Sequence, residues 1–170
     1  MAIPSTIHAF LGQARVPYCV LPHREALSVK EEAAVMHVSG RSWAKVVVCI
    51  ADGKAIHAVL PAPLVVNLKH LLALAGTDRI RFAAEEELSS LFLDCDIGAM
   101  PPLGPLYGHR VFVDESLAER LDIVFNAGTH RDAIRMRFAD FAAAVKPIFG
   151  RFAEPRADDV PAVTTRMGHQ

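Results

Sequence analysis

The sequence lacks the motifs of several common kinds of catalytic and metal site. Its three cysteines, Cys19, Cys49 and Cys95, form no CxxC pair, so neither a disulfide framework nor a zinc site is indicated. Its eight histidines show no HxxxH or HExxH spacing, and we predict no metal and no cofactor. The chain also has no GxxxxGKS or GxxxxGKT loop, no GxGxxG and no GxSxG. Nucleotide-driven chemistry and a serine nucleophile therefore have no support.

The sequence also lacks a strong net charge and long apolar runs. Its 170 residues carry 18 Lys and Arg against 19 Asp and Glu, a formal net charge of −1. No basic field covers the whole molecule, so any contact with nucleic acid must be local. No basic segment leads into a long apolar run, and no stretch is long enough to span a bilayer. We therefore expect a cytoplasmic protein with no membrane partner.

Hydrophobic residues are abundant, at 52% of the chain, which suits one domain with a substantial core. Apolar runs at 44–51 and 55–60 flank Asp52-Gly53, a strong hairpin signal. Helical spacing of apolar residues predicts helices between the strands, at 3–11, 28–39, 68–75, 85–91 and 138–145. This pattern indicates an α+β fold with a mixed, mainly antiparallel sheet flanked by helices.

The composition changes near residue 150. Residues 151–170 are polar and irregular, with Glu154-Pro155 and Asp158-Asp159. We assign residues 1–150 to the domain and 151–170 to a poorly ordered C-terminal tail.

One proline-rich segment stands out at 95–104, with the sequence CDIGAMPPLG. It cannot be helical, because Pro101 and Pro102 lack backbone donors and bias the residues before them away from helical angles. Gly98 would let a ligand approach the main chain closely, and a stiff loop there could point N–H groups at a carbonyl or phosphate. A buried turn that closes a sheet explains the same residues, and this segment alone favours that interpretation.

Lys45 is the first candidate side chain for chemistry. On the strand 44–51 it shares a face with Val47 and Cys49, so its ammonium lies at the rim of a buried surface. It could hold a phosphate or polarise a carbonyl there. As an edge lysine, it would only protect a strand end.

His130 and Asp96 are weaker candidates when judged locally. His130 follows a turn predicted at 126–129 and could bond a ligand, act as an acid or base, or lie idle on the surface. Asp94 and Asp96 flank Cys95, and they could work as paired carboxylates or as turn formers. Cys95 has no basic residue nearby in the sequence, so a nucleophilic thiol is not expected.

Taken in order, three stretches resemble one known family. They are SWAKVVV at 42–48, DIGAMPPLG at 96–104 with a GxxxP element from Gly98 to Pro102, and IVFNAGTH at 123–130. Together they resemble the YbaK/EbsC family of aminoacyl-tRNA editing domains, which includes the editing insertion of bacterial prolyl-tRNA synthetases and its free-standing relatives. His23, Ala26 and the helix from Ser28 resemble the family's N-terminal segment. The resemblance covers about residues 3–150.

The resemblance implies a barrel-like mixed sheet and hydrolysis of the ester that joins a wrong amino acid to tRNA. A second sieve is needed because a binding pocket separates amino acids one methylene apart by only about 1–3 kcal/mol. The implied substrate is the acceptor end of mischarged tRNA, and a synthetase is a candidate partner. The resemblance assigns catalysis to Lys45, Gly98 and His130. It assigns substrate binding to Val46, Asp96, Ala99, Met100, Pro102, Asn126 and Gly128.

The substrate amino acid stays open. Some alanine-specific members carry asparagine directly after the pocket lysine, whereas this chain has Val46. Val46 and Met100 indicate a small apolar pocket, so alanine, serine, threonine and cysteine esters are all candidates. Two rival interpretations remain. One is a non-catalytic module that holds an aminoacyl or nucleotide group on a synthetase, which the near-zero net charge favours. The other is a domain with a vestigial pocket.

Overall fold

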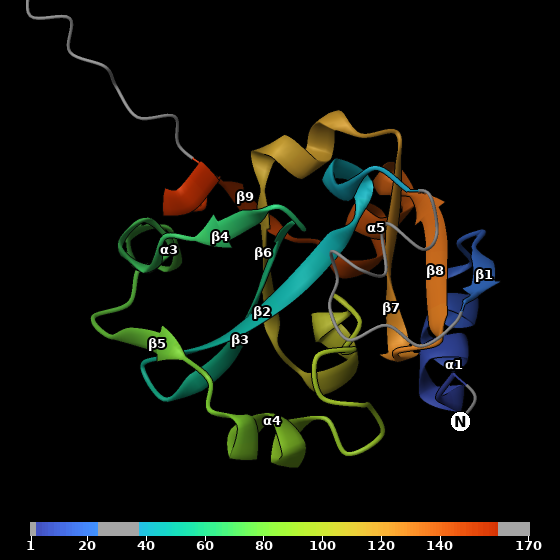
Figure 1. Ribbon diagram of the computed structural model, residues 1–170. Helices are drawn as coiled ribbons and strands as arrows, with labels where there is room; N and C mark the ends of the chain where they lie inside the picture. The colour runs from blue at the N-terminus through green and yellow to red at the C-terminus, as the bar shows by residue number, and fades with distance from the viewer. Residues whose placement is uncertain (1–2, 24–37, 160–170) are drawn as a thin grey trace, which may run out of the picture.

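The computed structural model describes residues 3–23 and 38–159 (Figure 1). The described helices are α1 (Ser5–Ala14), α3 (Leu68–Ala75), α4 (Glu85–Leu91) and α5 (Phe138–Val145). The described strands are β1 (Cys19–Pro22), β2 (Ala44–Ala51), β3 (Lys54–Pro61), β4 (Leu64–Val66), β5 (Ile80–Phe82), β6 (Arg110–Asp114), β7 (Asp122–Thr129), β8 (Asp132–Arg137), β9 (Ile148–Gly150) and β10 (Ala153–Pro155). Ala26 and the helix predicted from Ser28 lie outside the described residues. None of the described helices is long and apolar enough to cross a membrane.

The strands form three sheets. The largest has the order β5-β2-β3-β6-β9, the second β1-β8-β7, and the third pairs β10 with β4. Only the pairs β3–β6 and β6–β9 are parallel among the described pairings. The predicted mixed, mainly antiparallel α+β fold is therefore confirmed, and the described strands form these separate sheets without closing into one barrel.

Local signals place the first hairpin and the helix that follows it. Asp52 and Gly53 connect β2 to β3 with φ angles of 48° and 79°, a pair of positive values typical of a two-residue hairpin turn. The Asn67 side chain accepts a hydrogen bond from the His70 N–H at 3.1 Å and caps α3. Gly76 ends that helix in the left-handed conformation.

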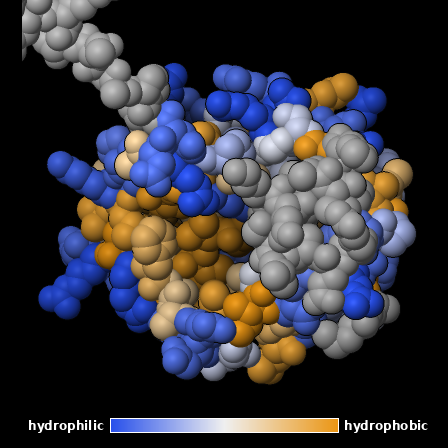
Figure 2. All heavy atoms as spheres, viewed as in Figure 1, coloured by the Kyte–Doolittle hydropathy of each residue, from blue (hydrophilic) through white to orange (hydrophobic). Residues whose placement is uncertain are grey.

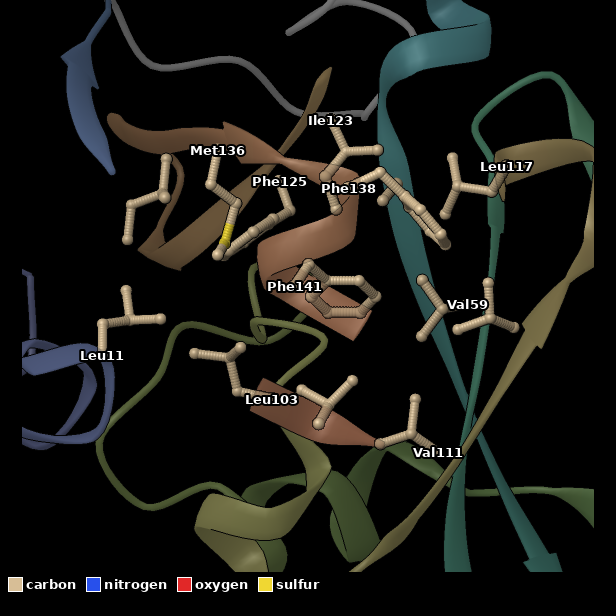
Figure 3. Packing of buried hydrophobic residues seen from close by; sticks show 14 of the residues in the cluster. Leu11, Val59, Leu103, Val111, Leu117, Ile123, Phe125, Met136, Phe138 and Phe141 are labelled. Carbon is tan, nitrogen blue, oxygen red and sulfur yellow. The ribbon is translucent and has the colours of Figure 1, made fainter. Parts of the chain in front are cut away.

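The main core lies between the largest sheet and the sheet that contains β7 and β8. Figure 3 shows Phe125 and Met136 on one side of this core and Val59 and Val111 on the other, with Phe141 of α5 between them. The opposite face of the largest sheet is covered by α3, β4 and residues 152–153, and a second core forms there. In Figure 1, β2 accordingly crosses the middle of the molecule, with α3 on one side and β7 on the other.

Two predictions about local structure differ from what is found. Residues 126–129 are not a turn but the end of β7, because their backbone continues to pair with β8 across a bulge. The packed part of the chain also extends past residue 150. Phe152 is fully buried and β10 pairs with β4, so the predicted tail contains ordered structure up to Asp159. Residues 160–170 lie outside the described part of the chain.

Candidate active site

The proline-rich loop lies along β7 and is held there by its main chain. The N–H of Asp96 donates to the Gly128 carbonyl at 2.8 Å, and the N–H of Gly128 donates to the Ala99 carbonyl at 2.8 Å. Ala99, Met100 and Pro102 are buried behind these bonds. The structure therefore brings five of the predicted site residues together on a fixed backbone.

Gly128 has a backbone conformation that only glycine adopts readily. Its φ is +89°, and it lies in the irregularity between Asn126 and Thr129 where the register of β7 against β8 shifts. A Cβ atom at this position would lie 2.8 Å from Cδ of Pro4. The bulge turns the N–H and C=O of Gly128 toward the proline-rich loop, which explains how a strand residue can hold that loop.

Gly98 forms the exposed turn of the loop and has a φ of +85°. Within the described residues, its N–H donates only to the thioether sulfur of Met100, with a nitrogen-to-sulfur distance of 3.3 Å. A thioether is a weak acceptor. An oxygen atom of a bound ligand would be a much better partner for this N–H.

His130 lies directly beside Gly98. A Cβ atom on Gly98 would lie 3.5 Å from Cε1 of His130. Nε2 of His130 lies 2.9 Å from the carbonyl oxygen of Ile97. A carbonyl oxygen only accepts, so Nε2 must carry the proton, and this nitrogen is not a base while the bond exists. The bond fixes the loop at the peptide that leads into Gly98.

Asn126 presents a buried acceptor in the same place. Its side chain is 4% exposed, and Nδ2 lies at 3.5 Å from the Gly98 carbonyl oxygen, at the outer limit for a hydrogen bond. Its Oδ1 has no hydrogen-bond partner within the described residues. A buried acceptor without a donor costs about 1–3 kcal/mol, so such an atom marks a place where a ligand donor would be stabilised.

The first half of β2 has an open edge. At its start, Trp43 forms a bridge with Val124 of β7, and further along β5 pairs with residues 49–51 only. Within the described residues, no strand pairs with residues 45–47 on this side. The Val48 carbonyl accepts from the Ala83 N–H at this edge. Because peptide directions alternate along a strand, Val46 points its own N–H and C=O to the same open edge.

An apolar surface surrounds this open edge. The side chain of Val46 packs on the cluster of Val48, Phe92 and Met100, so it touches the same group of side chains as the proline-rich loop. Figure 2 shows a hollowed apolar surface at the place where Figure 1 shows β2 between α3 and α4. Residues 45–47 at the open edge are themselves half-buried.

Lys45 lies on the other face of the same strand. It pairs with Leu60 and shares its face with Val47 and Cys49, as the sequence predicts. Burial, and secondarily the positive charge of Arg156, lower the pKa of Lys45 to about 8. Across residues 3–23 and 38–159, no hydrogen bond or ion pair joins Lys45 to the proline-rich loop. The structure therefore places Lys45 on the face of β2 opposite to Val46, whose side chain packs on the cluster that contains Met100 of the proline-rich loop.

Cys95 lies at the base of the proline-rich loop. Burial raises the pKa of its thiol to about 12, although a hydrogen bond from Tyr107 opposes this shift. The thiol therefore stays protonated near neutral pH and is a poor nucleophile. Asp94 accepts from Thr6 Oγ1 at 2.7 Å, which ties the loop to α1. In the described part of the chain, no group of three or more His, Cys, Asp or Glu residues could hold a metal ion.

Sequence reasoning missed two residues near the site. The Tyr107 hydroxyl lies 3.3 Å from Sγ of Cys95, a contact that no local pattern indicates. Arg156 approaches Lys45 from the segment that was assigned to the tail.

Solved structures share this fold. The crystal structure of hypothetical protein APE2540 has a TM-score of 0.79 at 19% identity, over 88% of this chain and 99% of that one. A candidate trans-editing enzyme for prolyl-tRNA synthetase has a TM-score of 0.75 at 20% identity, over 88% of this chain and 96% of that one. A search among curated proteins finds no match.

A family model, described as the aminoacyl-tRNA editing domain, matches residues 23–144. The match spans most of the chain and includes β2, the proline-rich loop and β7, which are the elements that form the candidate site. The chain therefore belongs to the aminoacyl-tRNA editing domain family.

Proposed function

We propose that this protein is a free-standing, trans-acting hydrolase that deacylates tRNA mischarged with a small amino acid: alanine, serine, threonine or cysteine. The observation that carries the proposal is that a weakly bonded donor and an acceptor without a donor belong to neighbouring residues. The Gly98 N–H donates only to a thioether, and Oδ1 of Asn126 beside it has no donor within the described residues. An aminoacyl ester brings the two complementary groups, a carbonyl oxygen and an α-ammonium.

The substrate would bind through these groups. The ester carbonyl oxygen accepts from the Gly98 N–H in place of the Met100 sulfur, and the α-ammonium donates to Oδ1 of Asn126 once this buried side chain turns toward the ligand. The amino-acid side chain then lies toward Val46 and Met100, whose cluster is apolar. Apolar contacts with these two side chains would suit a small amino acid, the class that is expected from the sequence.

The reaction needs no protein nucleophile. The oxygen of a water molecule attacks the acyl carbon, the bond from that carbon to the ribose oxygen breaks, and the ribose oxygen takes up a proton. The free ribose hydroxyl next to the ester orients the water. The Gly98 N–H stabilises the negative charge that develops on the carbonyl oxygen, and one such donor typically contributes a factor of about 10²–10³ in rate.

The neighbouring side chains have supporting roles in this proposal. His130 holds the Ile97 carbonyl at 2.9 Å and so positions the peptide that precedes Gly98. Lys45, which lies across the open edge of β2, anchors the end of the tRNA. The protonated thiol of Cys95 takes no part as a nucleophile.

The trans-acting character is supported by a relative. The structure named as a candidate trans-editing enzyme for prolyl-tRNA synthetase is matched over 96% of its length, so it is a protein of similar extent. The family itself supports tRNA as the substrate. A synthetase remains a candidate partner that would deliver the mischarged tRNA.

The test is release of amino acid from a panel of tRNAs mischarged with each of the four amino acids. We expect release from one or two of them, and a loss of at least about tenfold in the Lys45→Ala variant. Lys54→Ala is the matched control, because Lys54 is an exposed lysine at the far end of the same hairpin. If the Lys45→Ala variant deacylates at an unchanged rate, the assignment of a role to Lys45 is wrong. No release by the folded wild type from any substrate would favour the alternative, a non-catalytic aminoacyl- or nucleotide-binding module associated with a synthetase.

A further inference from the structure

Two strand pairings place Arg156 near the start of β2. In the small sheet, Pro155 of β10 lies opposite Leu64 of β4, and Arg156 is the next residue. In the large sheet, Pro61 of β3 lies opposite Ala44 of β2. Since only two residues separate Pro61 from Leu64, the end of β10 lies beside the residues that open β2.

Hydrogen bonds to neighbouring elements hold the segment that precedes Arg156. The Asp114 carboxylate is buried, and its Oδ1 accepts the N–H groups of Phe152 and Ala153, each at 2.9 Å. The Phe152 side chain is fully buried, and its carbonyl accepts from the Asn67 N–H at 2.7 Å. The backbone is therefore well held up to β10, and Arg156 extends from it as an exposed side chain.

Lys45 and Arg156 form an unneutralised pair of cations. In residues 3–23 and 38–159, neither side chain makes an ion pair with a carboxylate. The nearby Glu154 accepts a hydrogen bond from Nδ2 of Asn67 at 3.0 Å. Burial, and secondarily the nearby charge of Arg156, lower the pKa of Lys45 to about 8. Two like charges kept together without a counter-ion are stabilised by an anion that both can touch.

We propose that Lys45 and Arg156 together bind a phosphate of the tRNA acceptor end, namely the 5′-phosphate of the terminal nucleotide that carries the aminoacyl ester. This inference rests on the proposed function, because it places the phosphate on one side of the open edge of β2 and the ester on the other. The terminal nucleotide then crosses that edge at Val46. An arginine and a lysine are the usual side chains for such a contact, since both donate several hydrogen bonds to phosphate oxygens.

The site explains how a protein with a net charge of −1 binds tRNA. Contacts to phosphate need only a local concentration of positive charge. The family match ends at residue 144, so Arg156 comes from a segment beyond it. This half of the phosphate site is a feature of the C-terminal segment of the chain and not of the matched domain.

The first experiment measures binding and needs no catalysis. Adenosine 5′-monophosphate, adenosine and inorganic phosphate are titrated into the wild type, Arg156→Ala and Arg151→Ala. Arg151 is the matched control, an exposed arginine of the same segment that pairs with Glu115 at 2.8 Å. We expect the monophosphate to bind about tenfold more tightly than adenosine, and Arg156→Ala but not Arg151→Ala to abolish the difference. Equal binding of the two adenine compounds by the wild type, or inorganic phosphate that binds as tightly as the monophosphate, would overturn the inference.

The second experiment uses minimal ester substrates, the 3′-aminoacyl esters of adenosine and of adenosine 5′-monophosphate. Arg156→Ala should raise KM about tenfold for the phosphate-bearing ester and leave kcat, and both constants for the nucleoside ester, unchanged. An equal effect on both esters would overturn the phosphate assignment. If the wild type cleaves neither ester nor mischarged tRNA, the proposed function fails, while the binding experiment still decides whether the phosphate site exists.

Discussion

Acidification is expected to destabilise this protein through one buried histidine. His57 of β3 is fully buried, and its ring lies among those of Phe92, Tyr107 and His109. Its Nε2 lies 3.2 Å from Nδ1 of His109, and its Nδ1 has no partner within the described residues. Burial, and secondarily the charge of His109, lower the pKa of His57 to about 3. A proton on this ring would be an unpaired charge in an apolar site.

The magnitude follows from proton linkage. A histidine in the unfolded chain has a pKa of about 6.5, so below that pH the unfolded state binds one proton more than the folded state. The free energy of unfolding therefore does not depend on His57 protonation above pH 6.5, and it decreases steadily as the pH falls from 6.5 toward 3. At 1.36 kcal/mol per pH unit, a change from pH 6.5 to pH 5 lowers the free energy of unfolding by about 2 kcal/mol.

Urea unfolding at pH 7 and pH 5 measures this loss in the wild type and in His57→Gln, which does not titrate. His70→Gln is the control, because His70 is exposed on α3. Titrating groups that do not touch His57 affect all three proteins alike and cancel in the difference, so the remaining loss belongs to His57 together with its partner His109. We expect the wild type and His70→Gln to lose about 2 kcal/mol more than His57→Gln between the two pH values. The same loss in all three proteins would refute the assignment to His57.

Three further predictions concern the site and its support. Gly128→Ala should lower the free energy of unfolding by about 1–3 kcal/mol and reduce deacylation, because its φ of +89° and the 2.8 Å approach to Pro4 disfavour a side chain; an unchanged urea midpoint would contradict this. Asp114→Asn should cost about 1–3 kcal/mol and speed proteolysis of the C-terminal segment, because an amide cannot accept at both oxygen positions that Phe152, Ala153 and Ser116 now use. Affinity for adenosine 5′-monophosphate should fall as the pH rises through 8, where Lys45 loses its charge beside Arg156; constant affinity up to pH 9 would contradict that role.

The parts of the fold that the sequence predicts are those with local signals. The β2–β3 hairpin follows from Asp52-Gly53, and α3 follows from its apolar spacing between Asn67 and Gly76. The strands β4, β9 and β10 have three residues each, too few for an alternation to be recognised. They are fixed instead by partners distant in the sequence, as when Glu154 pairs with Val65. Such pairings depend on tertiary packing and leave no local pattern.

The candidate site was predictable in its parts but not in its geometry. The turn expected at 126–129 was wrong because asparagine and glycine are common turn formers, whereas here Gly128 forms a bulge inside β7. That bulge is what brings Asn126 and His130 to Gly98. Their catalytic and binding roles remain predictions. Arg156 could not be found from the sequence, because its position depends on the pairing of β10 with β4.

The proposed arrangement of the site gives a reason why none of the described strands pairs with residues 45–47 at the open edge of β2. Lys45 and Val46 are consecutive, so their side chains lie on opposite faces, one toward Arg156 and the other toward Met100. A substrate that touches both faces must pass over the edge between them, where no described strand pairs with the Val46 backbone. A strand paired there would block this path, and a longer β5 would do so by extending past Cys49. The proposed binding mode therefore requires that β5 pair with only a short part of β2. The length of β2 that must stay without a neighbouring strand is set by the distance from the phosphate to the ester within one nucleotide.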